Sequence, residues 1–159
     1  LAALENGIAQ APNFAENYFW ASKVYLLSNN LEKAWYHAEL FYNMTDDIEM
    51  SRTAKQTIRM TTNTMFGEKA DGYCSIDSNN VSAWMLQRQC LIDSFATESS
   101  LAMHLRKRWV ELDDKDLLEA YVASIYLEER TELLNWLAIN GQQFEQYRQW
   151  RTWNPLTIN

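Results

Sequence analysis

Glycine and proline are scarce in this chain of 159 residues, which contains only four glycines and two prolines. A β-sheet protein of this size needs many tight turns, and such turns use both residue types heavily. The scarcity therefore favours an all-α fold with helices joined by short polar turns. Hydrophobic residues make up 47% of the chain, enough to form a buried core. We expect a single domain over residues 1–159. Because the chain begins with Leu1 rather than Met, we also expect it to be part of a longer protein.

Long apolar runs and an excess of positive charge are also missing. No stretch of about 18 apolar residues is present, so we expect no membrane-spanning helix. The net charge is −7, whereas a protein that binds nucleic acid normally presents a basic face to the phosphates. We therefore expect no nucleic-acid partner, and long-range steering would favour a basic protein or peptide. The basic cluster Arg106-Lys107-Arg108 is interpreted as a solvated helix face.

Residues that carry catalysis or bind metals form no recognisable group. Cys74 and Cys90 lack CxxC spacing and cannot form a metal site alone. We expect two reduced thiols, and one disulfide between them in an oxidising compartment is the alternative. His37 and His104 have no carboxylate three or four residues later, and we expect surface or half-buried side chains. The sequence contains no HExxH motif, glycine-rich phosphate loop or Gly-x-Ser-x-Gly elbow. We predict no catalytic residue, no metal site and no cofactor.

Helical periodicity extends through almost the whole chain and predicts eight or nine helices, nearly all in antiparallel pairs. The segment 47–65 is rich in Thr, Arg, Lys and Gln, so we expect this helix to be weakly buried. Residues 66–80 contain two glycines and many turn-forming residues, and we expect a long, mobile loop there. The expected helices cover residues 2–10, 15–28, 31–44, 47–65, 81–96, 101–112, 115–129, 132–140 and 142–150.

One part of the chain, residues 12–46, has the spacing of a helical repeat. Pro12 and Asp46 mark two breaks whose separation matches the length of one such repeat. Between them stand Tyr18-x2-Ala21-Ser22-x2-Tyr25, then Ala34, Ala38 and Phe41. This pattern resembles the tetratricopeptide repeat, in which small residues let two helices approach closely while large ones fill the adjacent groove. The resemblance implies antiparallel hairpins stacked as a right-handed superhelix. Another array of α-helical hairpins is the alternative.

The resemblance also implies a binding surface, because the first helix of each pair lines a concave groove that holds peptides in the tetratricopeptide family. On this model Tyr18 and Tyr25 pack inside the hairpin, whereas Phe19 and Tyr121 project into the groove. The alternative is that Phe19 and Tyr121 pack against neighbouring helices and no groove is open. The implied partner-binding residues are Glu16, Phe19, Lys23, Leu26, Met50, Thr53, Thr57, Met60, Met85, Gln89, Tyr121 and Ile125.

Two functions follow from these expectations. The first is a scaffold or adaptor that binds a protein or peptide partner in the groove. The second is an accessory helical domain of a larger enzyme, or of a secretion or assembly complex, that positions a polypeptide or glycan for another domain. Sequence beyond the two ends of this chain would distinguish them, because a catalytic domain there would favour the second. The sequence does not indicate a cellular location.

Overall fold

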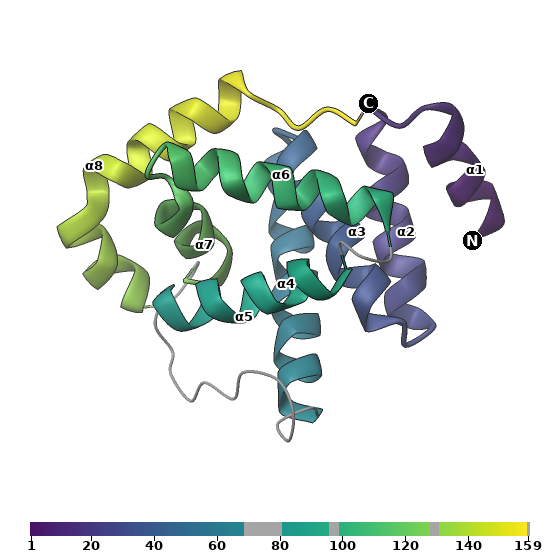
Figure 1. The fold of residues 1–159 in the computed structure, drawn as a ribbon, viewed down its shortest axis with the longest axis horizontal. Helices are drawn as coiled ribbons and strands as arrows, with labels where there is room; N and C mark the ends of the chain where they lie inside the picture. The colour runs from purple at the N-terminus through teal and green to yellow at the C-terminus, as the bar shows by residue number, and fades with distance from the viewer. Residues whose placement is uncertain (69–80, 96–98, 128–130, 159) are drawn as a thin grey trace. The chain divides into compact units, whose positions relative to one another are not determined.

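The computed structural model describes residues 1–68, 81–95, 99–127 and 131–158, and this part of the chain is all α-helical. Eight helices are present in these ranges, packed largely as adjacent antiparallel pairs (Figure 1). None of them is long and apolar enough to cross a membrane. The helices are α1 (Ala2–Gln10), α2 (Ala15–Leu27), α3 (Leu31–Met44), α4 (Ile48–Glu68), α5 (Val81–Phe95), α6 (Ser100–Asp114), α7 (Leu118–Tyr126) and α8 (Thr131–Trp153).

The predicted helices agree with the observed ones to within two residues at most ends, with three larger differences. Helix α7 begins at Leu118 and ends at Tyr126, whereas a helix over residues 115–129 was predicted. Helix α4 continues to Glu68, so the start of the loop expected over residues 66–80 is helical, and residues 69–80 lie outside the described ranges. The two helices expected on either side of Gly141 form one kinked helix, α8. Its backbone leaves helical geometry at Asn140, with φ −114° and ψ 18°, one residue before the predicted stop.

The chain divides into two compact units. Unit 1 comprises Leu1–Lys69 and Pro155–Asn159, and unit 2 comprises Ala70–Asn154. In unit 1, α2 packs between α1 and α3, and α4 packs against α3 and touches α2. In unit 2, α7 contacts α5, α6 and α8, and α5 also contacts α6. That residues 1–159 form one repeat domain stays a prediction.

Small side chains lie where α2 packs against α3. Ala21, Ser22 and Ala34 are completely buried, as the repeat pattern predicted. The Ser22 hydroxyl donates to the Phe19 carbonyl at 2.7 Å, so its polar group is satisfied inside its own helix. Tyr18 is also completely buried, and its hydroxyl donates to the Pro12 carbonyl at 2.8 Å. These residues form the centre of unit 1.

A tight turn of two asparagines joins α2 to α3. Asn29 has a φ of 56°, a left-handed conformation that asparagine adopts more readily than most residues. The Asn30 side chain then caps α3, because its Oδ1 accepts a hydrogen bond from the Lys33 backbone N–H at 3.1 Å. The predicted break at residues 28–30 is thus confirmed as a turn with a helix cap.

Helix α4 is more deeply buried than its polar composition predicted. Thr57, Thr61 and Thr62 are all buried, and each donates its hydroxyl hydrogen to a backbone carbonyl four residues earlier. The Thr57 hydroxyl lies 3.1 Å from the Thr53 carbonyl oxygen, and the Thr62 hydroxyl lies 2.8 Å from that of Ile58. A hydroxyl satisfied within its own helix can be buried at little cost. The expectation of a weakly buried helix is therefore wrong.

The buried face of α4 is also rotated from the predicted repeat register. The repeat spacing would place Lys55 at the position equivalent to Ala21, but Lys55 is only half-buried. Two apolar residues, Ala54 and Ile58, are buried instead, each one position earlier than the repeat counterparts of Ala21 and Tyr25. A shift of one residue rotates a helix face by about 100°. This rotation brings small and apolar side chains, rather than charged ones, to the interior.

His37 is buried, whereas a surface or half-buried position was expected. Its ring lies among Tyr36, Tyr25 and Tyr18, with centroids 4.5, 4.9 and 6.0 Å away. Its Nδ1 lies 2.8 Å from the Lys33 carbonyl, which can only accept, so Nδ1 carries the proton. Burial lowers the pKa of His37 from 6.5 to about 4, which keeps the ring neutral at pH 7.

The close approach of α2 and α3 gives a first test. Replacing Ala21 with Leu adds three carbons at a position with no exposed surface, and we expect the unfolding free energy to fall by about 1–3 kcal/mol. Ala9→Leu, at an exposed position of α1, is the matched control. Urea denaturation measures both. Equal midpoints for the two variants would mean that α2 tolerates a large side chain at residue 21.

The buried histidine predicts a specific pH dependence. The unfolded chain protonates His37 near pH 6.5, whereas the folded protein does so only near pH 4, so stability falls as pH drops through this window. The full loss is on the order of 3 kcal/mol. His37→Phe is expected to remove this part of the pH dependence, and His104→Phe, at a half-buried position, to leave most of it. Urea midpoints between pH 7 and pH 4.5 measure the difference, and parallel profiles for wild type and His37→Phe would contradict it.

Candidate functional site

The best-defined candidate surface in unit 1 lies along α2 and α4, which a hydrogen bond holds together. Lys23 Nζ donates to Thr57 Oγ1 at 3.2 Å, and the same ammonium lies 5.4 Å from the centroid of the Phe19 ring. Partial burial lowers the pKa of Lys23. A lysine that is partly desolvated in this way loses less hydration when a partner's carboxylate or carbonyl approaches.

Six of the eight site residues predicted in unit 1 are at least partly exposed. Glu16 and Met60 are exposed, and Lys23, Leu26, Met50 and Thr53 are half-buried. Phe19 and Thr57 are buried, so the expectation that they project from the surface is wrong. Phe19 packs against Phe41 of α3, with ring centroids 5.1 Å apart. Thr57 faces Lys23 and lies under it.

The four site residues predicted in unit 2 do not form an exposed stripe. Tyr121 and Ile125 have no exposed surface, so their predicted position in an open groove is wrong. Met85 and Gln89 are half-buried, and Gln89 donates to the carboxylate of Asp93 at 2.8 Å. Since these residues belong to unit 2, the structure does not assign them to one site with the residues of α2 and α4.

A buried arginine explains why Tyr121 lies inside unit 2. Arg88 on α5 is completely buried, and its Nη2 donates to the Tyr121 hydroxyl at 3.0 Å. Its guanidinium also lies 4.3 Å from the Trp109 ring centroid and 4.7 Å from that of Tyr121. Burial lowers the pKa of Arg88, and the aromatic faces partly compensate for its lost hydration. No sequence motif indicates this cluster, because it joins three helices.

The basic cluster Arg106-Lys107-Arg108 is only partly the solvated face that was expected. Arg106 and Lys107 are exposed, but Arg108 is buried. Arg108 Nη1 forms an ion pair with Glu111 at 3.1 Å, and its Nη2 donates to the Asn154 carbonyl. Its guanidinium lies 4.2 Å from the Trp150 ring centroid. Arg108 therefore fixes the end of α8 within unit 2 and is not a free cation for an acidic partner.

Two exposed apolar residues of α2 were missed by the sequence analysis. Trp20 is 56% exposed and Leu27 is 88% exposed. With Glu16 and Lys23 they follow the spacing i, i+4, i+7 and i+11, so they share one face of the helix. This periodicity could have identified them, but the repeat model assigned the exposed face to Phe19 and Leu26. On α4, Met60 is 50% exposed.

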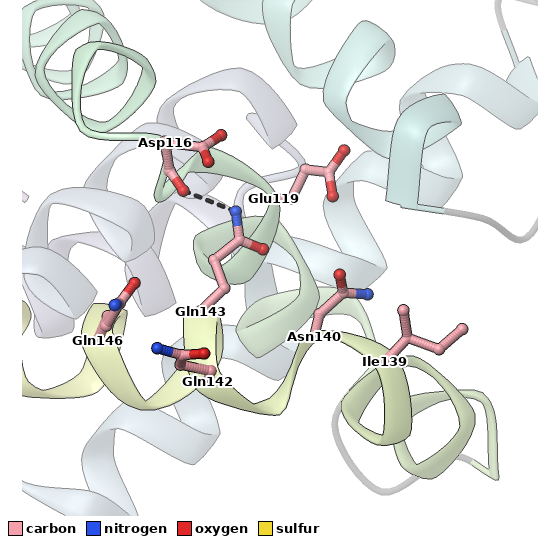
Figure 2. A pocket seen from close by; sticks show the side chains of 7 residues that line it. All are labelled: Asp116, Glu119, Ile139, Asn140, Gln142, Gln143 and Gln146. Carbon is pink, nitrogen blue, oxygen red and sulfur yellow. Dashed lines mark hydrogen bonds between the residues drawn. The ribbon is translucent and has the colours of Figure 1, made fainter.

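A polar pocket lies in unit 2 between the turn that precedes α7 and the kink of α8 (Figure 2). Its volume is about 560 Å³. Gln143 donates from its side-chain amide to the Asp116 carbonyl at 2.6 Å, as the dashed line in Figure 2 shows. Amides and carboxylates of this kind can hydrogen-bond a hydroxyl-rich or amide-rich molecule. The lining residues are Asp116, Glu119, Ile139, Asn140, Gln142, Gln143 and Gln146.

Comparison of the chain with protein-family models, with curated proteins and with solved structures finds no match. Within the described ranges, no three His, Cys, Asp or Glu side chains are grouped so that they could hold a metal ion. Cys90 lies half-buried on α5, and Cys74 falls in residues 69–80, outside the described ranges. A disulfide between them stays the alternative to two reduced thiols.

Substitutions of two adjacent aromatic residues can test which face of α2 is buried and which is exposed. Phe19 is 8% exposed, and Phe19→Ala is expected to lower the unfolding free energy by about 3–5 kcal/mol because it leaves a cavity. Trp20→Ala removes a largely exposed side chain, and we expect a loss of about 1 kcal/mol or less. Urea denaturation measures both variants. The reverse order of the two effects would mean that the buried face of α2 is assigned incorrectly.

Proposed function

We propose that this chain is a protein-interaction module that binds a segment of another polypeptide along α2 and α4. The name α2–α4 surface is used here for Trp20, Lys23, Leu27, Thr53 and Met60. The hydrogen bond between Lys23 and Thr57 supports the proposal most directly, because it places the exposed residues of two helices on either side of one contact.

The composition of the α2–α4 surface fits a polypeptide partner. Three large apolar side chains are at least half exposed there: Trp20, Leu27 and Met60. Tryptophan is enriched among the residues that dominate binding energy at interfaces, and methionine adapts its shape to different partners. Lys23 provides a donor between them for a backbone carbonyl or a carboxylate. The net charge of −7 favours a partner with basic residues outside this contact.

We infer further that the hairpins stack as in tetratricopeptide repeats. Lys23 and Thr57 are 34 residues apart, the spacing that this family would place at equivalent positions of successive first helices. The small residues buried between α2 and α3 also support the inference. The buried positions of α4 fall one position short of this spacing from those of α2, which departs from the family pattern, so the right-handed superhelix stays part of the proposal.

The alternative function is an accessory domain that positions a substrate for an enzyme. The pocket beside α7 and α8 favours it, since its amides and carboxylates suit a glycan or peptide with many hydrogen-bonding groups. Its lining contains no aromatic side chain on which a sugar ring could stack. We therefore rank this function below binding at the α2–α4 surface.

Selection from a displayed library of random peptides tests the proposed function. We expect the chain to enrich peptides that bind in solution, as measured by fluorescence anisotropy. Trp20→Ala should weaken these peptides about thirtyfold, the effect of about 2 kcal/mol that is common for an aromatic anchor. Lys23→Glu should weaken them as well. Trp153→Ala removes a tryptophan that is 82% exposed and lies outside this surface, so it is the matched control.

Two outcomes would contradict the proposal. Enriched peptides that bind wild type and Trp20→Ala equally would show that their site lies elsewhere on the chain. A selection that enriches no peptide above a blank surface would remove the support for a peptide-binding module. Circular dichroism of each variant ensures that lost binding does not reflect unfolding.

A further inference from the structure

The residues that follow α8 belong to unit 1, although α8 itself belongs to unit 2. Residues 155–158 are not helical, and they pass across one end of the pair formed by α2 and α3. In Figure 1 this yellow segment runs to the loop that connects α1 and α2. We call residues 155–158 the terminal segment.

Three hydrogen bonds hold the backbone of the terminal segment. The Ile158 N–H donates to Asn13 Oδ1 at 2.7 Å, and Asn13 Nδ2 donates to the Ile158 carbonyl at 3.2 Å. The Leu156 N–H donates to the Asn43 carbonyl at 2.9 Å. Asn13 therefore binds both backbone groups of one residue with its side-chain amide. Both hydrogen bonds are to backbone atoms, so they do not depend on the side chain of the bound residue.

The side chains of the terminal segment alternate between the protein and solvent. Ile158 is buried, Leu156 is half-buried, and Thr157 between them is exposed. Alternation of this kind, with backbone bonds at every second residue, is typical of an extended strand. The segment thus binds unit 1 as an extended peptide with apolar residues at alternate positions.

The groups that hold the terminal segment are themselves fixed by residues 11–45. The Phe14 N–H donates to the Ala11 carbonyl at 3.0 Å, which closes the turn that carries Asn13. The side chain of Asn43 donates to the Glu39 carbonyl at 2.8 Å within α3. None of these bonds uses a residue of the terminal segment, so the backbone that carries Asn13 and Asn43 is held without it.

We propose that this end of the α2–α3 pair is a docking site for an extended peptide of the pattern apolar-any-apolar, and that Leu156-Thr157-Ile158 occupies it in cis. A separate polypeptide with the same pattern displaces the segment. The site lies on residues other than those of the α2–α4 surface, so the proposal goes beyond the proposed function and can fail independently of it. A covalently attached ligand competes at a high effective concentration, which reaches about millimolar for short flexible connections. The cis segment therefore weakens binding in trans.

A fluorescent synthetic peptide with the sequence of residues 153–159 tests this competition by anisotropy. The receptor is the full chain carrying Leu156→Ser and Ile158→Ser, which removes both apolar anchors from the cis segment. We expect this variant to bind the peptide at least tenfold more tightly than the wild-type chain. Adding Asn13→Ala should weaken binding at least tenfold. A peptide with Thr157→Ala should bind like the original, because that side chain is exposed, whereas one with Ile158→Ser should not bind.

Each result of this experiment either supports or overturns the proposed docking site. Failure of the folded double variant to bind, or equal binding of the original and Ile158→Ser peptides, would overturn the proposal. If the double variant does not fold, hydrogen exchange of the wild-type chain tests whether the peptide displaces the terminal segment. Excess unlabelled peptide should then accelerate exchange at the amides of Leu156 and Ile158, and unchanged exchange would overturn the proposal. A dimer of the wild-type chain that Ile158→Ser abolishes would make a second copy the occupant and would overturn a separate peptide in that role.

Discussion

The close approach of α2 and α3 is the constraint on which unit 1 depends. Ala21, Ser22 and Ala34 have no exposed surface, and larger side chains at these positions would separate the two helices. The antiparallel pairing brings the start of α2 and the end of α3 to the same end, where Asn13 and Asn43 both reach the terminal segment. Both proposed binding surfaces thus require the same small residues, although neither surface contains them.

Helices and turns could be predicted from the sequence because their causes are local. The break at residues 28–30 and the cap at Asn30 depend only on asparagine's side chain and the next turn of backbone. The buried faces of the helices were harder to predict, because they depend on how neighbouring helices pack. From the sequence alone, Thr57 and Phe19 are expected at the surface. In the structure the Thr57 hydroxyl donates to the Thr53 carbonyl, and Phe19 packs against Phe41. The amino-acid composition of these helices does not indicate either contact.

The exposed face of α2 was predicted to within about one position along the helix. Glu16, Lys23 and Met60 lie on the exposed face as expected, whereas Trp20 replaces its neighbour Phe19 as the exposed aromatic. A repeat pattern predicts the spacing of the helices along the sequence, but packing decides which face of each helix is buried. A shift of one residue in the sequence register rotates the buried face by about 100°. The clusters around Arg88 and Arg108 could not be predicted, since each joins residues from separate helices.

The contact between Asn13 and Ile158 joins two residues of unit 1 that are 145 positions apart, and the sequence of unit 2 lies between them. Chains emerge from the ribosome at about 5–20 residues per second and fold from the amino-terminal end. Residues 1–68 can therefore form their helices seconds before Ile158 is synthesised. During that interval the amide of Asn13 faces water, and the proposed docking site is open to another extended chain of the pattern apolar-any-apolar, including that of a neighbouring nascent protein. Once Ile158 has been synthesised the segment can enter the site, so the first occupant of the site during biosynthesis need not be the chain's own segment.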